Sequence, residues 1–197
     1  GRTTCAYFYP NEAKIIYAST HHSDEKCPPP PDRSKGYVWK LYDSFDIFLR
    51  DGDELKQLTD LPGYDAEATV SPKGDKIVFT SLRNGDPEIY KMNLDGSEQT
   101  RLTFETGYDG GPFFSPDGKW IAYNSDESGR DEVYVQSFPN PGTKVLVSEN
   151  GGINAIWSRD GRELYFVSGT RMMAVSIETR PAPRVGSPRR LFDGGFN

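Results

Sequence analysis

The chain has 197 residues, of which 35% are hydrophobic and 13% aromatic, and its formal net charge at pH 7 is −6. This acidity, with no local cluster of Lys and Arg, argues against nucleic-acid binding. No apolar run approaches the roughly 20 residues that a membrane-spanning helix needs, so no membrane span is expected. The many Gly and Pro residues and the aromatic β-formers favour an all-β fold.

The first unit, expected over residues 1–62, is the least regular. An inner strand leads to a turn at residues 9–12, and further strands are expected at 15–19, 45–48 and 57–59. An insertion at 20–42 separates the second strand from the third. The chain opens at Gly1-Arg2 rather than at Met, which indicates processing or trimming.

The insertion supplies two predictions. Cys27 is followed by four prolines, a stiff loop that would gain from a covalent anchor, so a Cys5–Cys27 disulfide is expected; two separate thiols are the alternative. Tyr37, Trp39 and Tyr42 lie close to lysines, and exposed aromatics beside charge are typical of interface hot spots. These three aromatics are therefore candidate partner-binding residues, unless they pack down on the first unit.

A turn motif then recurs along the chain. Ser71-Pro72-Lys73-Gly74 returns as Ser115-Pro116-Asp117-Gly118 and, altered, as Ser158-Arg159-Asp160-Gly161, after 44 and 43 residues. An apolar triplet that ends in an aromatic and closes on Ser follows each of these turns. A period in the low forties built from short β segments is typical of propeller blades. We therefore predict one domain, 1–197, with four four-stranded blades at about 1–62, 63–106, 107–150 and 151–197.

The repeat also predicts what its recurring residues do. Four aromatics share one position after the turn and should form the core between blades: Tyr17, Phe79, Tyr123 and Phe166. Three acids precede the apolar pair of the third strand and are expected to hydrogen-bond between blades or to pair with Lys or Arg rather than to act in catalysis: Asp46, Glu88 and Glu132.

A cation site is the main candidate for chemistry. Alignment on the turn places Cys5, Glu67, Gly111 and Asn154 at equivalent positions of the innermost strands, which line the channel of a propeller. Asp65, Glu67 and Asp109 could therefore converge on the axis and hold calcium or another hard cation through oxygen ligands. The alternative is that Asp65 and Asp109 cap turns, which needs no ion. No other cofactor is expected.

The quoted turns, together with Glu88-Ile89-Tyr90, Asp95-Gly96-Ser97 and Arg101-Leu102-Thr103, resemble the repeat of TolB-like propellers, the periplasmic component of the Tol–Pal system and its relatives. Residues 1–118 resemble secreted TolB-like proteins, whereas 119–197 are more similar to the sensor propellers behind bacterial membrane serine/threonine kinases. The resemblance implies a periplasmic or extracellular location. Because the family usually has six blades, a stand-alone four-blade domain, part of a larger ring and a chimera all stay open.

No catalytic motif is present, and the Gly-x-Ser-x-Gly elbow of the peptidases that often accompany such propellers is missing. We therefore predict a non-enzymatic propeller that binds a protein partner or acts as a scaffold. A self-associating or engineered chimeric scaffold is one alternative. A hydrolase that uses channel carboxylates is another, and it would need two carboxyl groups at a suitable separation.

Overall fold

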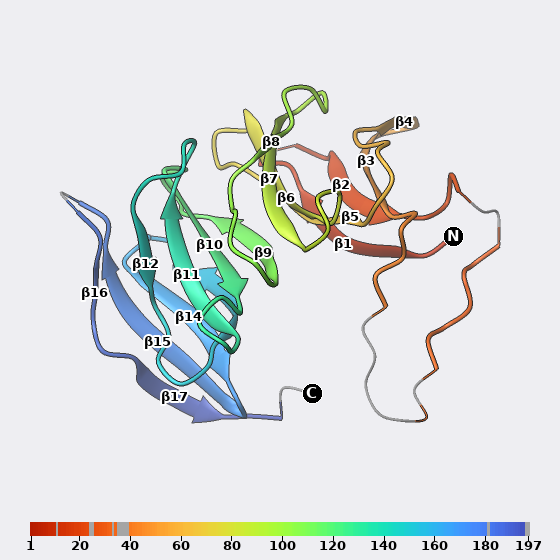
Figure 1. Cartoon of the computed structure of the whole chain (residues 1–197). Coiled ribbons are helices and arrows are strands. Elements are labelled where there is room, and N and C mark those ends of the chain that lie inside the picture. Colours follow the sequence, from red (N-terminus) through yellow and green to blue (C-terminus); the bar gives the residue numbers. More distant parts are fainter. Residues whose placement is uncertain (11, 24–25, 33, 35–39, 181, 196–197) are drawn as a thin grey trace.

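The computed structural model describes residues 1–10, 12–23, 26–32, 34, 40–180 and 182–195. Within these residues the chain forms β-strands and no helix, so no described helix is available to cross a membrane. The strands make four antiparallel sheets that follow one another in chain order (Figure 1). The predicted all-β propeller fold is confirmed.

Each sheet is one blade, in which consecutive strands pair with their neighbours. Blade 1 contains β1 (Thr3–Phe8), β2 (Ile15–Ser19), β3 (Asp46–Asp51) and β4 (Glu54–Gln57). Blade 2 contains β5 (Asp65–Val70), β6 (Lys76–Ser81), β7 (Glu88–Asn93) and β8 (Thr100–Arg101). Blade 3 contains β9 (Asp109–Phe114), β10 (Trp120–Ser125), β11 (Glu132–Ser137) and β12 (Lys144–Leu146).

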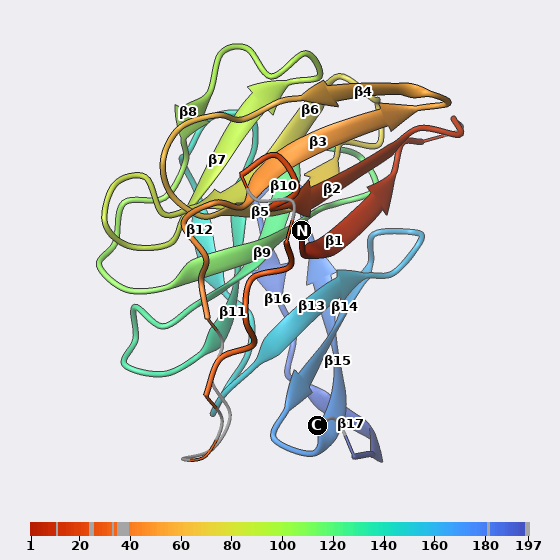
Figure 2. The same cartoon turned by 90° about the vertical axis from the view of Figure 1, so that its right-hand side faces the viewer.

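Blade 4 has one strand more than expected. It contains β13 (Ile153–Trp157), β14 (Glu163–Ser168), β15 (Arg171–Glu178), β16 (Arg184–Val185) and β17 (Arg189–Asp193). β15 is long enough to pair with β17 along its first half and with β16 at its end. The sequence predicted only a loop where β16 lies. Figure 2 shows blade 4 below blade 1, with β13 on the side of β1.

The recurrent turns owe their shape to a serine and a glycine. The hydroxyl of Ser115 accepts a hydrogen bond from the amide of Trp120 at 3.1 Å, and Ser158 does the same for Glu163 at 2.9 Å. Gly161 has a φ of +71°, which favours glycine. A Cβ on Gly161 would also meet Cδ of Pro116 at 3.4 Å, so the proline of one turn packs against the glycine of the next.

Aromatic side chains fill the spaces between blades. Phe79 and Tyr123 are fully buried, and their rings lie 5.8 Å from Tyr90 and 6.1 Å from Tyr134. Phe166 is buried at the equivalent place in blade 4. The core prediction is confirmed for these three aromatics.

Tyr17 differs from the other three because it lies on the outward face of the first blade, where it is only half-buried. The Tyr17 ring stacks on Phe48 at 5.9 Å. The rings of His21 and His22 lie 4.3 Å and 4.8 Å from Phe48 and complete its burial. The beginning of the insertion thus covers a face that a preceding blade covers in blades 2 to 4.

Candidate binding site at the propeller axis

Each innermost strand contains one residue in the left-handed backbone region. These residues are Cys5 (φ 51°), Glu67 (φ 57°), Gly111 (φ 61°) and Asn154 (φ 58°), the four positions that the sequence alignment made equivalent. The pairing register shifts there in all four blades, between Thr4 and Tyr7 in the first. The four inner strands therefore share a β-bulge that directs one residue of each toward the axis.

These residues line two contiguous cavities. The axial cavity, of about 240 Å³, receives residues from all four inner strands, including the four left-handed ones. A second cavity of about 350 Å³ lies at the ends of the strands where β1 and β5 begin, and Arg2, Lys40, Tyr42 and Tyr64 are among its lining residues. We call this second cavity the channel mouth. Cys5 and Glu67 line both cavities.

Glu67 is held by hydrogen bonds from two blades. Its Oε2 accepts from the Thr80 hydroxyl at 2.7 Å and from the backbone amide of Gly111, in the next blade, at 2.9 Å. The Tyr108 hydroxyl donates to the same oxygen at 3.4 Å. Burial, followed by the charge of Glu67, raises the pKa of Tyr108, which keeps this hydroxyl a donor at neutral pH. A carboxylate with this many donors has a fixed position at the axis.

The channel mouth carries positive charge over an aromatic ring. The guanidinium of Arg2 lies 5.5 Å from the ring centroid of Tyr42, and the ammonium of Lys40 lies 4.9 Å from it. Tyr42 is half-buried and its ring meets Phe45 edge-on at 6.1 Å. It therefore packs on blade 1 and lines the mouth at the same time. The other two candidate partner-binding residues, Tyr37 and Trp39, lie outside the described residues.

The predicted Cys5–Cys27 disulfide is wrong, because both thiols are free and exposed. Cys5 is part of the axial bulge, where partial desolvation of its thiolate and the nearby charge of Glu67 raise its pKa. Hydrogen bonds attach the insertion instead. Arg2 Nε donates to the carbonyl of Pro28 at 3.1 Å, and the Tyr42 hydroxyl donates to that of Pro29 at 2.7 Å.

The predicted cation site is also wrong. Among the described residues no three His, Cys, Asp or Glu side chains come close enough to hold a metal ion. Glu67 faces the axis, but Asp65 and Asp109 are 1% and 2% exposed at the junctions between blades. The bulge is the reason. It interrupts the strict alternation of side chains, so residues two apart no longer point the same way.

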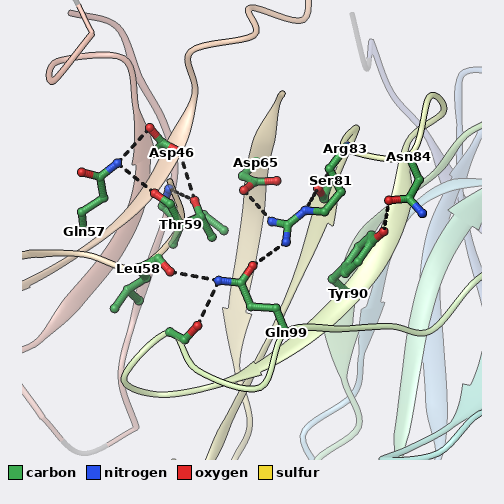
Figure 3. A network of polar contacts seen from close by, with 12 residues as sticks. Asp46, Gln57, Leu58, Thr59, Asp65, Ser81, Arg83, Asn84, Tyr90 and Gln99 are labelled. Carbon is green, nitrogen blue, oxygen red and sulfur yellow. Dashed lines mark hydrogen bonds and ion pairs between the residues drawn. The ribbon is translucent and has the colours of Figure 1, made fainter. Parts of the chain in front are cut away.

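Asp65 belongs to a polar network between blades 1 and 2 (Figure 3). Arg83 donates to Asp65 Oδ2 at 2.7 Å and to Gln99 Oε1 at 2.5 Å, and its guanidinium lies 4.8 Å from the ring centroid of Tyr90. Gln99 in turn donates to the carbonyl of Leu58 in blade 1 at 3.2 Å. Arg83 thus connects the aromatic core of blade 2, through Tyr90, to the junction of blades 1 and 2, through Asp65 and Gln99.

The acids before the third strands take the structural role expected of them. Asp46, Glu88 and Glu132 each accept a hydrogen bond from a hydroxyl that follows the fourth strand of the same blade, from Thr59, Thr103 and Ser148 respectively. Arg101 pairs with Glu88, and Arg130 with Glu132. The hydroxyl partners were not predicted from the sequence, although a signal for them is visible in the recurring pairs Leu58-Thr59, Leu102-Thr103 and Val147-Ser148.

Two blade junctions bring carboxyl groups close together. Burial, and then the charge of Asp65, raise the pKa of Asp46 to about 6. Burial also raises the pKa of Asp109 to about 6, with a further contribution from Glu88. At the third junction Gly152 occupies the position that Asp65 and Asp109 occupy at the other two, so Glu132 has no neighbouring acid from this position. There hydrogen bonds lower the pKa of Glu132 despite its burial. The raised pKa values therefore belong to the junctions, not to a catalytic pair at the axis.

Residues 47–182 match the family model described as the TolB beta propeller domain. The chain belongs to this family. Among curated relatives, the Tol-Pal system protein TolB of Bordetella pertussis is 43% identical over 44 residues, and that of Bordetella parapertussis matches equally. The match covers 22% of this TolB-like chain and 10% of each relative, so the activity and partners of those proteins do not transfer directly.

Solved structures confirm the TolB-like fold. TolB from Acinetobacter baumannii superposes with a TM-score of 0.72 at 24% identity, over 98% of this chain and 44% of that one. A puromycin-hydrolysing peptidase of Mycobacterium tuberculosis gives a TM-score of 0.67 at 18% identity, over 98% of this chain and 30% of the peptidase. TolB and a peptidase share this propeller, so the fold alone does not decide the function.

Proposed function

We propose that this chain is a non-enzymatic TolB-like propeller that binds a segment of a protein partner at the channel mouth, in the periplasm or outside the cell. The observation that supports this most is the composition of the mouth. Arg2 and Lys40 flank the half-buried ring of Tyr42, and Glu67 lies below them at the entrance to the axis. Aromatic anchors beside arginine are the groups that contribute most at protein interfaces.

The same geometry disfavours the hydrolase alternative. Acid–base hydrolysis would need a second carboxyl group near Glu67. The bulge instead leaves Glu67 as the one acidic residue among the described residues that line the axial cavity and the mouth. The hydrogen bonds from Thr80 and Gly111 also hold Glu67 Oε2 in one position, which suits a fixed binding group.

Site-specific photocrosslinking tests the proposal. A photoreactive amino acid is placed at Tyr42 in one protein and at the exposed Lys56 of β4 in a control, and both are irradiated in a bacterial envelope extract. We expect a crosslinked product with one partner protein from position 42 and none from position 56. This product should disappear when Arg2 and Lys40 are both changed to Gln. Equal crosslinking from both positions, or a product that survives the double change, would refute the mouth as the binding site.

Self-association is a second candidate, supported by exposed apolar side chains of blade 4. Ile156 of β13 and Phe192 of β17 are 56% and 54% exposed, and Leu191 is 40% exposed. Large exposed apolar side chains in one blade are unusual for a monomer. Light scattering coupled to size exclusion would show an oligomer that Ile156→Ser disperses. A monomer at all accessible concentrations would remove this candidate.

A further inference from the structure

A groove on the opposite rim of the propeller is distinct from the channel mouth. The mouth lies where the inner strands begin, whereas the groove lies at the turns where they end. It has a volume of about 670 Å³, and its lining comes from three blades: Lys73, Gly118, Lys119, Trp120, Phe138, Pro139, Thr179 and Arg180. None of these residues touches the axial cavity.

The charge of the groove is opposite to that of the chain. Among the described residues three cations line it, from the turns of blades 2 and 3 and from the segment that follows β15, and no carboxylate does. The whole chain has a net charge of −6. Lys73, Lys119 and Arg180 all have exposed side chains, and within the described part of the chain only Arg180 forms an ion pair, with Asp117 at 3.4 Å. A local cationic site on an acidic protein selects an acidic ligand that is small enough to contact only that site.

The floor of the groove is apolar and rigid. Trp120 is 9% exposed, and the half-buried ring of Phe138 packs edge-on against Phe114 at 4.9 Å. The amide of Phe138 donates to the carbonyl of Lys119 at 2.8 Å, and Lys91 Nζ donates to the carbonyl of Pro139 at 2.7 Å. The first bond joins the two turns that form the floor, and the second ties one of them to β7 of blade 2. An apolar side chain of a ligand could therefore dock without reordering the protein.

From this combination we infer that the groove binds a short acidic peptide segment with one apolar side chain. The cations meet the carboxylates and the Trp120–Phe138 floor receives the apolar group. A long polyanion such as nucleic acid fits less well, because beyond the groove it would meet the negative surface of the chain. The volume accommodates a few residues, which is the scale of a linear recognition motif.

The test measures binding of the fluorescein-labelled peptide Glu-Glu-Leu-Glu-Glu by fluorescence anisotropy. We expect saturable binding that weakens with salt, because exposed charges are screened. Lys73→Gln combined with Lys119→Gln should weaken binding about tenfold, the effect of roughly 1.4 kcal/mol. Lys14→Gln combined with Lys56→Gln removes the same charge elsewhere and should change binding less than about twofold. Melting curves of both double variants establish that they fold.

A second comparison tests the apolar floor. Glu-Glu-Ser-Glu-Glu, which keeps the charge and loses the leucine, should bind several-fold more weakly than the leucine peptide. Absence of binding to the leucine peptide would overturn the proposal. So would equal losses in the two double variants, which would show that net charge alone attracts the peptide. Inorganic polyphosphate is the competitor for both peptides. If it displaces them equally well, the groove is a general anion-binding surface and the proposal is overturned.

Discussion

The backbone amide of Gly111 donates to the carboxylate of Glu67 across the junction of two inner strands, at 2.9 Å. Both residues have the left-handed conformation, which costs a residue with a Cβ roughly 1–2 kcal/mol. The hydrogen bonds to Glu67 offset that cost. The same backbone geometry is thus occupied by glycine in one blade and by a carboxylate, held from the neighbouring blade, in another.

Replacing Glu67 with glycine should therefore destabilise the protein although it relieves the backbone. We expect a loss of about 1–3 kcal/mol, because Gly111 N and the Thr80 hydroxyl lose their acceptor. Glu98 is the matched control, since it has a φ of 55° and an exposed side chain. Glu98→Gly should be neutral or stabilising by up to about 1 kcal/mol. Chemical denaturation measures both, and equal effects would contradict the role of the hydrogen bonds.

Stability should depend on pH through Asp109. Its pKa is raised to about 6 in the folded protein, chiefly by burial, so the fold holds this proton more tightly than the unfolded chain does. The stabilisation is complete below the unfolded pKa of about 3.9 and is lost as the pH rises through about 6. Asp109→Asn removes the titration. Relative to the parent it should gain on the order of 1–3 kcal/mol between pH 4 and pH 7.

Asp160→Asn is the control for this titration. Hydrogen bonds from Ser158 and the amide of Arg162 lower the pKa of Asp160, so its charged form is the stable one. The variant should lose stability relative to the parent as pH rises from 3 to 5. Urea denaturation at each pH measures both variants. A parallel pH profile for the parent and Asp109→Asn would contradict the raised pKa.

Arg83→Ala should be among the most damaging single changes. The Arg83 and Asp65 side chains are 10% and 1% exposed, and removing one member of such a pair leaves a buried charge, at about 3–5 kcal/mol. Adding Asp65→Asn should recover part of that loss. Arg50→Ala, which breaks an exposed pair with Asp53, should cost less than about 1 kcal/mol. A double variant no more stable than Arg83→Ala would contradict this account.

The repeated core aromatics give a further prediction. Phe79→Ala or Tyr123→Ala should cost about 3–5 kcal/mol, because each leaves a large cavity between two blades. Phe8→Ala removes a ring that is 66% exposed and should have little effect. Thermal melts compare the three. Losses below about 1 kcal/mol at both buried positions would mean that the blades do not pack through these rings.

The free thiols can be counted directly. Alkylation of freshly purified protein without reductant should add two labels, with Cys5 reacting more slowly because partial desolvation of its thiolate raises its pKa. Cys27 supplies the comparison within the same molecule. Intact mass gives the number of labels and peptide mapping their order. Labels that appear only after reduction would contradict the structure.

The blade repeat could be predicted from the sequence because short local patterns determine its turns and strands. The Ser115 turn and the buried Phe79 follow from patterns of a few residues, and both occur where expected. The candidate cation site failed for a reason that is absent from such patterns. Whether Glu67 and Asp65 share a direction depends on a bulge, and glutamate is a poor indicator of the left-handed backbone that the bulge requires.

The cysteine pairing failed for a related reason. The composition of the insertion showed that it needed an anchor, but not that a guanidinium and a tyrosine hydroxyl would supply one. Arg2 and Tyr42 reach the carbonyls of Pro28 and Pro29, which lie next to Cys27. Proline carbonyls are good acceptors in any sequence, so nothing in the residue types distinguishes this attachment from a disulfide.

The shared bulge has a consequence for how such a channel can change. Cys5, Glu67, Gly111 and Asn154 are a thiol, a carboxylate, a hydrogen and an amide on one backbone geometry. The direction of each side chain is set by its own strand, so a substitution at one of these positions alters the chemistry of the axis without altering the sheets around it. Blades built on one repeat can thereby line the channel with four different functional groups, each of which can be changed separately.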